Sequence, residues 1–169
     1  YAVVAVASGS GIQNWFLECG ADEIIDGGQS NNPSAEDMLA AFDRAGADTI
    51  FVLPNNSNIL LTARQAAKLY TAADVRVIPS RNIGAGYAAL SMLDTDSGDT
   101  DTIVAGITEA MEGVICASVS RSVRDTEEVH RGEYIGFVGH EIVSDADDRL
   151  DALRKTADVL QDKAADIVI

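Results

Sequence analysis

Ala2-Val3-Val4-Ala5-Val6-Ala7 is a continuous run of apolar residues, half of them β-branched. A strand covered by helices on both faces has this composition, whereas a half-exposed strand alternates apolar and polar residues. Ser8-Gly9-Ser10-Gly11 follows this run directly. The next apolar residues recur at helical spacing until Gly20: Ile12, Trp15, Phe16 and Cys19. The stretch therefore predicts the first strand and helix of a parallel α/β sheet.

The same order of elements repeats along the first half of the chain. Strand-like segments at residues 23–25, 49–53 and 75–78 alternate with helical patterns. One helix is predicted to begin after Ser34, a good N-cap with Asp37 at the capping-box position, and to end at Gly46. Others are expected after residue 58 and over residues 87–93. We therefore expect residues 1–98 to form an α/β domain of parallel β-α repeats with helices on both faces.

The second half, residues 99–169, has a different pattern. A helix is expected to begin at residue 99 or 100, and residues 114–124 then alternate apolar and small polar side chains. Residues 134–138 and 141–143 flank Gly139-His140, a hairpin signal, and a last helix follows. We expect an antiparallel hairpin section here. Residues 166–169 begin another strand-like segment, so we expect a domain truncated at its C-terminus and a chain that is part of a longer protein.

Composition narrows the classes of partner. The chain has 169 residues, 12 Lys and Arg against 27 Asp and Glu, and a net charge of −15. Phosphate neutralisation needs a basic surface, so we expect no nucleic-acid binding, and anionic lipid is disfavoured equally. No apolar run approaches the roughly 20 residues of a membrane span, so no membrane insertion is expected. Cys19 and Cys116 have no metal-ligand spacing, and the acidic stretch 94–101 lacks the EF-hand pattern, so no metal site is predicted.

Polar loops follow the predicted strands, where an open α/β sheet places its binding crevice. Two of them are rich in amides, hydroxyls and backbone N–H groups: Gly27-Gly28-Gln29-Ser30-Asn31-Asn32-Pro33-Ser34 and Leu53-Pro54-Asn55-Asn56-Ser57-Asn58. Asn also caps helices and tolerates left-handed backbone, so part of this composition is turn chemistry. The candidate binding residues are Ser8, Gly9, Ser10, Gly11, Gln29, Ser30, Asn31, Asn32, Ser34, Asn55, Asn56, Asn58, Arg81, Arg124 and Asp125.

Catalysis is harder to assign. Ser8-Gly9-Ser10-Gly11 could place helix N–H groups around a phosphate or carboxylate, or could simply be a tight turn that needs glycine. It matches neither the dinucleotide-binding nor the nucleoside-triphosphate loop. Serines there would act as nucleophiles only beside a base, and His130 and His140 are distant in sequence. Arg81 is the cation placed to meet an anion, while Arg124 and Asp125 could be a surface ion pair, which would contribute little to stability.

The chain resembles a known family. Val4-Ala5-Val6-Ala7-Ser8-Gly9-Ser10-Gly11, Gly27 to Asp37, and Leu53-Pro54-Asn55-Asn56-Ser57-Asn58-Ile59 are similar to the C-terminal region of the fatty acid kinase ATP-binding subunit, the YloV-type, dihydroxyacetone-kinase-like (Dak phosphatase) family. Further matching runs continue in order along nearly the whole chain: Gln65-Ala66-Ala67, Val77-Ile78-Pro79-Ser80, Val123-Arg124-Asp125-Thr126 and Gly132-Glu133-Tyr134-Ile135-Gly136. The family usually has Thr and Met at Ser30 and Asn31, and Lys at Ser57. The missing lysine removes a cation from the expected site.

The resemblance implies a cytoplasmic bacterial protein with a DegV-like fold. It implies that ATP and magnesium bind a separate N-terminal domain, so no cofactor is expected in this stretch, which would not phosphorylate a substrate alone. It also implies an acyl-binding partner protein of the DegV type, which presents the fatty acid carboxylate, and allows a homodimer of the longer protein.

The sequence thus predicts a non-catalytic docking and assembly domain whose Gln/Asn loops and Arg81 loop contact the acyl-binding partner. On this hypothesis, replacing Asn55 and Asn56 by Ala weakens the complex and leaves the fold intact. Two alternatives stay open. One is a small phosphotransferase or phosphatase using the Ser8-Gly9-Ser10-Gly11 loop. The other is a lipid-binding module, which requires a long apolar tunnel.

Overall fold

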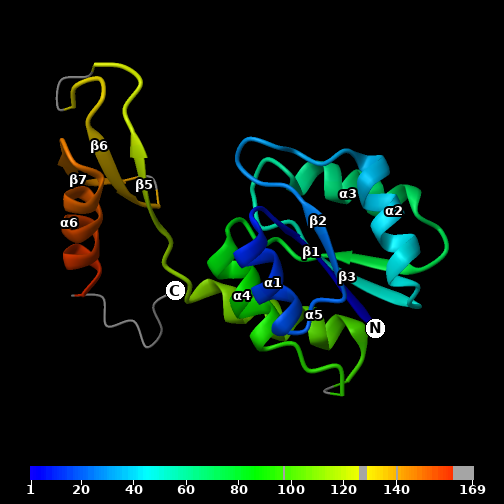
Figure 1. The fold of residues 1–169 in the computed structure, drawn as a ribbon. Helices are drawn as coiled ribbons and strands as arrows, with labels where there is room; N and C mark the ends of the chain where they lie inside the picture. The colour runs from blue at the N-terminus through cyan, green and yellow to red at the C-terminus, as the bar shows by residue number, and fades with distance from the viewer. Residues whose placement is uncertain (97, 126–128, 140, 162–169) are drawn as a thin grey trace. The chain divides into compact units, whose positions relative to one another are not determined.

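The computed structural model describes residues 1–96, 98–125, 129–139 and 141–161. The chain divides into two compact units, Tyr1–Val114 and Ile115–Ile169. Figure 1 shows the helices and strands of each unit. The predicted mixed α/β fold is confirmed, since one unit contains a parallel sheet with helices and the other an antiparallel sheet.

The first unit is built on a four-stranded parallel sheet. Its strands are β1 (Ala2–Ala7), β2 (Glu23–Asp26), β3 (Thr49–Leu53) and β4 (Asp74–Val77), in the order β2-β1-β3-β4. Val4 of β1 aligns with Glu23 of β2 on one side and with Val52 of β3 on the other. All six residues of β1 are buried, as its uninterrupted apolar sequence predicts.

Five helices cover the two faces of this sheet: α1 (Ser10–Glu18), α2 (Ala35–Ala45), α3 (Leu60–Leu69), α4 (Ile83–Ser91) and α5 (Thr100–Glu112). Alternate strand residues point to opposite faces. Val3 and Phe51 therefore pack in one core with α1, α4 and α5, while Val4 and Val52 pack in the other with α2 and α3 (Figure 1). This arrangement confirms the prediction of helices on both faces.

Side-chain caps set the beginnings of α2 and α4, whereas α1 and α3 begin without one. The Ser34 hydroxyl accepts from the Asp37 N–H, the Asp37 carboxylate accepts from the Ser34 N–H, and Gly46 ends α2 in the left-handed region at φ 58°. Helix α4 begins at Ile83, four residues before the predicted start. The Asn82 side chain caps it by accepting the Ala85 N–H at 2.8 Å, and this outweighs the low helix propensity of the glycines in its first turn.

The second unit holds a three-stranded antiparallel sheet and one helix. β5 (Ala117–Arg121) pairs with β6 (Tyr134–Val138), which pairs with β7 (Glu141–Ala146), and α6 (Arg149–Gln161) follows. The predicted antiparallel section and last helix are both present. The register shifts between Gly136 and Phe137, where a β-bulge gives β7 one extra residue. The strand predicted at residues 166–169 and the histidine at 140 lie outside the described residues.

The boundary between the two units falls between Val114 and Ile115, whereas the sequence analysis divided the chain between residues 98 and 99. The difference comes from α5, whose buried residues Ile103 and Ile107 belong to the same hydrophobic core as Phe51 and Leu90. Helix α5 is therefore part of the first unit. The second unit begins at Ile115, two residues before the first residue of β5.

Candidate functional site

The carboxyl edge of the parallel sheet collects four of the predicted loops. Because β1 to β4 run in the same direction, the loops that leave them emerge at one edge. β1 and β3 are neighbours, yet the helices that follow them, α1 and α3, cover opposite faces of the sheet. This is a topological switch point, the position at which open α/β sheets form their binding crevice.

The loop after β1 is exposed at Ser8, Gly9, Ser10 and Gly11. Gly9 has φ 83°, a left-handed conformation that favours glycine, and it precedes α1 without providing a side-chain cap. The first N–H groups of α1 have no partner within the helix, as at any helix start. Among the described residues no hydrogen bond of the Ser8 or Ser10 hydroxyl is found.

The loop after β2 is held at its base and exposed at its tip. The Gly28 N–H donates to the Asn31 oxygen at 2.8 Å. A Cβ on Gly27 would lie 2.7 Å from Cδ of Pro33, so only glycine suits this position. The exposed residues of the tip are Gln29, Ser30, Asn31 and Asn32. Hydrogen bonds from Ser34 lower the pKa of the Asp37 carboxyl, which keeps the capping box charged.

Asn55, after β3, is buried rather than presented to a partner. Its side chain is only 6% exposed, and its backbone is left-handed at φ 54°. Its Nδ2 donates to the Val6 oxygen at 3.0 Å, and its N–H donates to Oγ of Ser80 at 3.1 Å. A Cβ built on Gly86 would fall within its amide group. Asn55 thus joins the ends of β1 and β3, the loop after β4, and helix α4.

One atom of this residue is unusual. Oδ1 of Asn55 is buried and has no hydrogen-bond partner among the described residues. A buried acceptor without a partner costs about 1–3 kcal/mol, and a left-handed non-glycine backbone adds to that. Two contacts hold the Asn55 amide in place. Its Nδ2 donates to the Val6 carbonyl oxygen, and its amide group packs against Gly86, which has no side chain. We refer to Asn55, Val6, Ser80 and Gly86 as the asparagine latch.

Asn56 and Asn58 shape the next turn. Asn56 is 5% exposed, and its Oδ1 accepts the Asn58 N–H at 2.9 Å, an Asx turn that leads into α3. Ser57 and Asn58 are exposed. Because both Asn55 and Asn56 are buried, replacing them by alanine changes the packing under the loops, and the pair is unsuitable as a probe of the surface alone.

Arg81 is exposed in the loop after β4, beside the buried Ser80. Within the described parts of the chain it forms no ion pair. It is therefore a free cation at the same edge of the sheet as the exposed loop tips.

Arg124 and Asp125 belong to the second unit. The Arg124 carbonyl accepts the Ser122 hydroxyl at 2.6 Å, and Oδ1 of Asp125 accepts the Arg131 N–H at 2.9 Å and lies 3.7 Å from Nδ1 of His130. Across the described residues no ion pair joins Arg124 to Asp125, so this alternative from the sequence is not the one the structure has. Both residues instead organise the turn that precedes β6.

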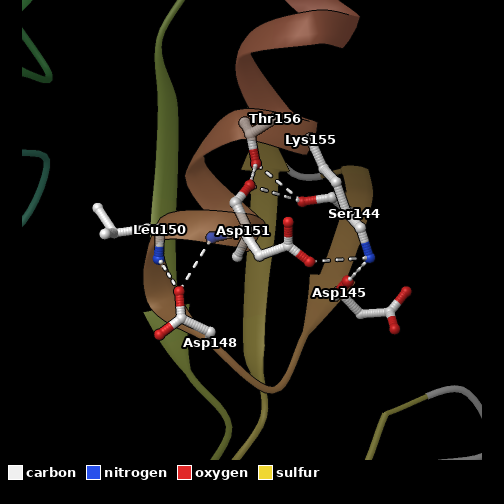
Figure 2. Close-up of polar contacts among 8 residues, drawn as sticks. Ser144, Asp145, Asp148, Leu150, Asp151, Lys155 and Thr156 are labelled. Atoms are coloured by element: carbon white, nitrogen blue, oxygen red, sulfur yellow. Dashed lines mark hydrogen bonds and ion pairs between the residues drawn. The ribbon is translucent and has the colours of Figure 1, made fainter.

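The second unit contains a polar cluster that the sequence analysis missed (Figure 2). Oγ of Ser144 lies 2.8 Å from Oγ1 of Thr156, which donates to the Ala152 oxygen at 2.7 Å. A Cβ built on Gly136 would fall against both hydroxyls, so this glycine lets α6 approach β6. The only signal in the sequence was that Ser144 and Thr156 occupy positions where the strand and helix patterns place core residues. The cluster holds α6 on the sheet.

Beside it lies an acidic pocket of about 290 Å³ lined by Glu133, Asp145, Ala146, Asp147, Asp148, Asp151 and Lys155. Nζ of Lys155 donates to the backbone carbonyl oxygen of Asp145 at 2.9 Å and lies 3.9 Å from the Asp151 carboxylate (Figure 2). Asp148 caps α6 by accepting the Leu150 N–H. In the described residues no group of three or more His, Cys, Asp or Glu is arranged to hold a metal ion.

Comparison with known proteins identifies the family. The sequence model for the FakA-like C-terminal region of fatty acid kinase matches residues 2–169. The chain belongs to this family. Protein YloV of Bacillus subtilis strain 168 is 36% identical over 158 residues, covering 91% of this chain and 28% of YloV. A protein of Staphylococcus haemolyticus strain JCSC1435 is 39% identical over 151 residues, covering 87% of this chain and 27% of its own length.

The resemblance inferred from the loop sequences is therefore confirmed at the level of the family. The chain spans less than a third of the length of these relatives. Among the described residues, no helix is both long enough and apolar enough to cross a membrane.

Proposed function

We propose that this chain is the docking domain of a fatty-acid-kinase-type protein, and that its carboxyl-edge loops bind an acyl-carrying partner protein of the DegV type. ATP and Mg²⁺ would be bound by another part of the longer protein, which would phosphorylate the fatty acid carboxylate. Family membership supports the kinase context.

The observation that carries the proposal is the asparagine latch beneath the exposed loops. It fixes the ends of β1, β3 and α4 relative to one another, while Ser57, Asn58 and Arg81 in the loops after β3 and β4 stay exposed. Loops that are ordered before binding lose less conformational entropy on association. A buried, strained amide that supports an exposed polar edge is therefore well suited to a recognition surface.

One apolar cavity of the first unit bears on the lipid-binding alternative. The apolar cavity between the sheet and helices α4 and α5 is lined by Val3, Phe51, Leu53, Leu90 and Ile107, among others, and has a volume of about 10 Å³. This is about the space that a single water molecule needs. A fatty acyl chain would need a far longer tunnel than this cavity provides.

The test is calorimetry with the acyl-binding protein encoded in the same genome, with and without loaded fatty acid. We expect micromolar or tighter binding. Replacing the exposed amides Gln29, Asn31 and Asn32 by alanine should weaken it about tenfold, since several interfacial hydrogen bonds would be lost. Gln161→Ala, an exposed amide on α6, is the matched control. No binding by the unchanged chain in either state would refute the proposal, and inorganic phosphate would then be titrated against the loop after β1.

A further inference from the structure

The outer face of helix α3 is unlike the rest of the first unit. Leu61 and Leu69 are each 66% exposed, two helical turns or about 12 Å apart. Arg64 and Lys68 lie between them on the same face, and both are exposed. Large exposed apolar side chains bordered by charged ones are typical of interaction surfaces. We call Leu61, Arg64, Lys68 and Leu69 the α3 face.

The charge of this face opposes that of the chain. The protein has a net charge of −15, yet α3 is the one helix of the described part that has basic and no acidic side chains. Arg44 and Arg76 form ion pairs with carboxylates, whereas no ion pair of Arg64 or Lys68 is found among the described residues. Like charges four residues apart on a helix repel each other, although Lys68 in the last turn of α3 also interacts favourably with the helix dipole.

We propose that the α3 face docks an acidic, apolar element of the acyl-binding partner, such as a helix with carboxylates beside a leucine-type ridge. The inference rests on the proposed function and extends its surface. The exposed residues Ser57 and Asn58 lead directly into α3, so the α3 face is continuous with the loop after β3. Carboxylates of the partner would pair with Arg64 and Lys68 while its apolar side chains cover Leu61 and Leu69.

Two other occupants fit less well. A symmetric dimer through α3 would bring the Arg64 and Lys68 side chains of one copy toward those of the other, which is repulsive. An anionic membrane would attract these two cations but repel the chain as a whole, because its net charge is −15. A short acidic element of a partner protein would lie close to Arg64 and Lys68, where salt screens the attraction least, and farther from the acidic residues elsewhere on the chain.

The experiment compares two charge reversals of equal size. Arg64→Glu with Lys68→Glu alters the α3 face, and Arg149→Glu with Arg154→Glu alters exposed arginines of α6. Each variant is titrated by calorimetry with the fatty-acid-loaded acyl-binding protein of the same genome. We expect the α3 variant to bind about tenfold more weakly or worse and the α6 variant to bind within about twofold of the unchanged chain. Leu61→Ala with Leu69→Ala should also lose about tenfold.

The outcomes separate the two proposals. If the unchanged chain does not bind the partner, both the proposed function and the α3 docking surface are wrong. If it binds and the α3 variants bind equally well, or if the α6 variant loses as much, the α3 inference is overturned and the docking function stands. An α3 variant that loses only self-association, or only binding to phosphatidylglycerol vesicles, would also overturn it.

Discussion

Gly86→Ala is the sharpest test of the asparagine latch, because the added methyl group would collide with the Asn55 amide. In the interior of a helix, replacing glycine by alanine normally stabilises a protein by about 0.5–1 kcal/mol. At Gly86 the obstacle is a side chain held by hydrogen bonds to Val6 and Ser80, so it cannot easily move away. We expect a net loss of about 1–3 kcal/mol, the range for overpacking a well-packed core.

Gly106→Ala in α5 is the matched control. A Cβ at Gly106 would have no atom of another residue within 4 Å, so we expect only the helix-propensity gain of about 0.5–1 kcal/mol. Asn55→Gly removes the obstacle and suits the left-handed φ of 54°. In that background Gly86→Ala should become neutral or stabilising, which gives a coupling between the two sites of about 1–4 kcal/mol.

The assay is urea unfolding followed by the fluorescence of Trp15, the one tryptophan of the chain. Trp15 stacks on Tyr87 of α4 with ring centroids 4.6 Å apart, so its signal reports on the first unit and on α4 directly. If Gly86→Ala proves as stable as Gly106→Ala, or if the Asn55 and Gly86 effects simply add, the latch is not the constraint that the geometry indicates.

Three further predictions concern titration and packing. The folded-state pKa of Asp37 is lowered, so its contribution to stability is present above its unfolded pKa near 3.8 and is lost as the pH falls through the folded value; the thermal midpoints of the unchanged chain and Asp37→Asn should differ at pH 7 and converge in acid. Gly136→Ala should separate α6 from β6, because the methyl group meets Thr156, and should lower protection of β6 amides from hydrogen exchange by about tenfold or more; unchanged protection would contradict this packing. Cys116 is exposed, yet partial desolvation by neighbouring atoms raises the pKa of its thiol above the usual 9.0, so its alkylation by iodoacetamide should still increase with pH above 9, and a plateau below 9 would contradict the shift.

Local sequence patterns predicted most of the first unit, because hydrophobic periodicity and capping act between residues near in the chain. The uninterrupted run of β1 and the Ser34–Asp37 capping box both have the expected structure. Helix α4 begins earlier than predicted. Gly84 and Gly86 are poor helix formers, so the sequence pattern placed the start of the helix after them. Gly86 is explained only by Asn55, 31 positions away, and no local pattern contains that information.

In the candidate loops, too, the local structure could be predicted from the sequence and the tertiary contacts could not. Amides after a strand indicate turns and exposed binding groups equally well, and the two interpretations separate only when tertiary contacts are known. Asn55 and Asn56 proved to be buried, whereas Gln29, Asn31 and Asn32 are exposed. Ser80, whose hydroxyl accepts the Asn55 N–H, was not among the candidate binding residues, because a lone serine after a strand is common.

The buried and exposed amides can be understood together. A loop tip that reads a partner through hydrogen bonds gains little if it must first be ordered, because the entropy of ordering offsets the bonds that it forms. The asparagine latch provides that order in advance for the loops after β3 and β4, at the expense of one unpaired oxygen and one left-handed backbone. Such strain persists only where surrounding contacts over-determine it, and here these contacts come from β1, the loop after β4, and α4. The same region leads directly into the α3 face, so a partner that binds both would meet a surface whose loop geometry is fixed before contact.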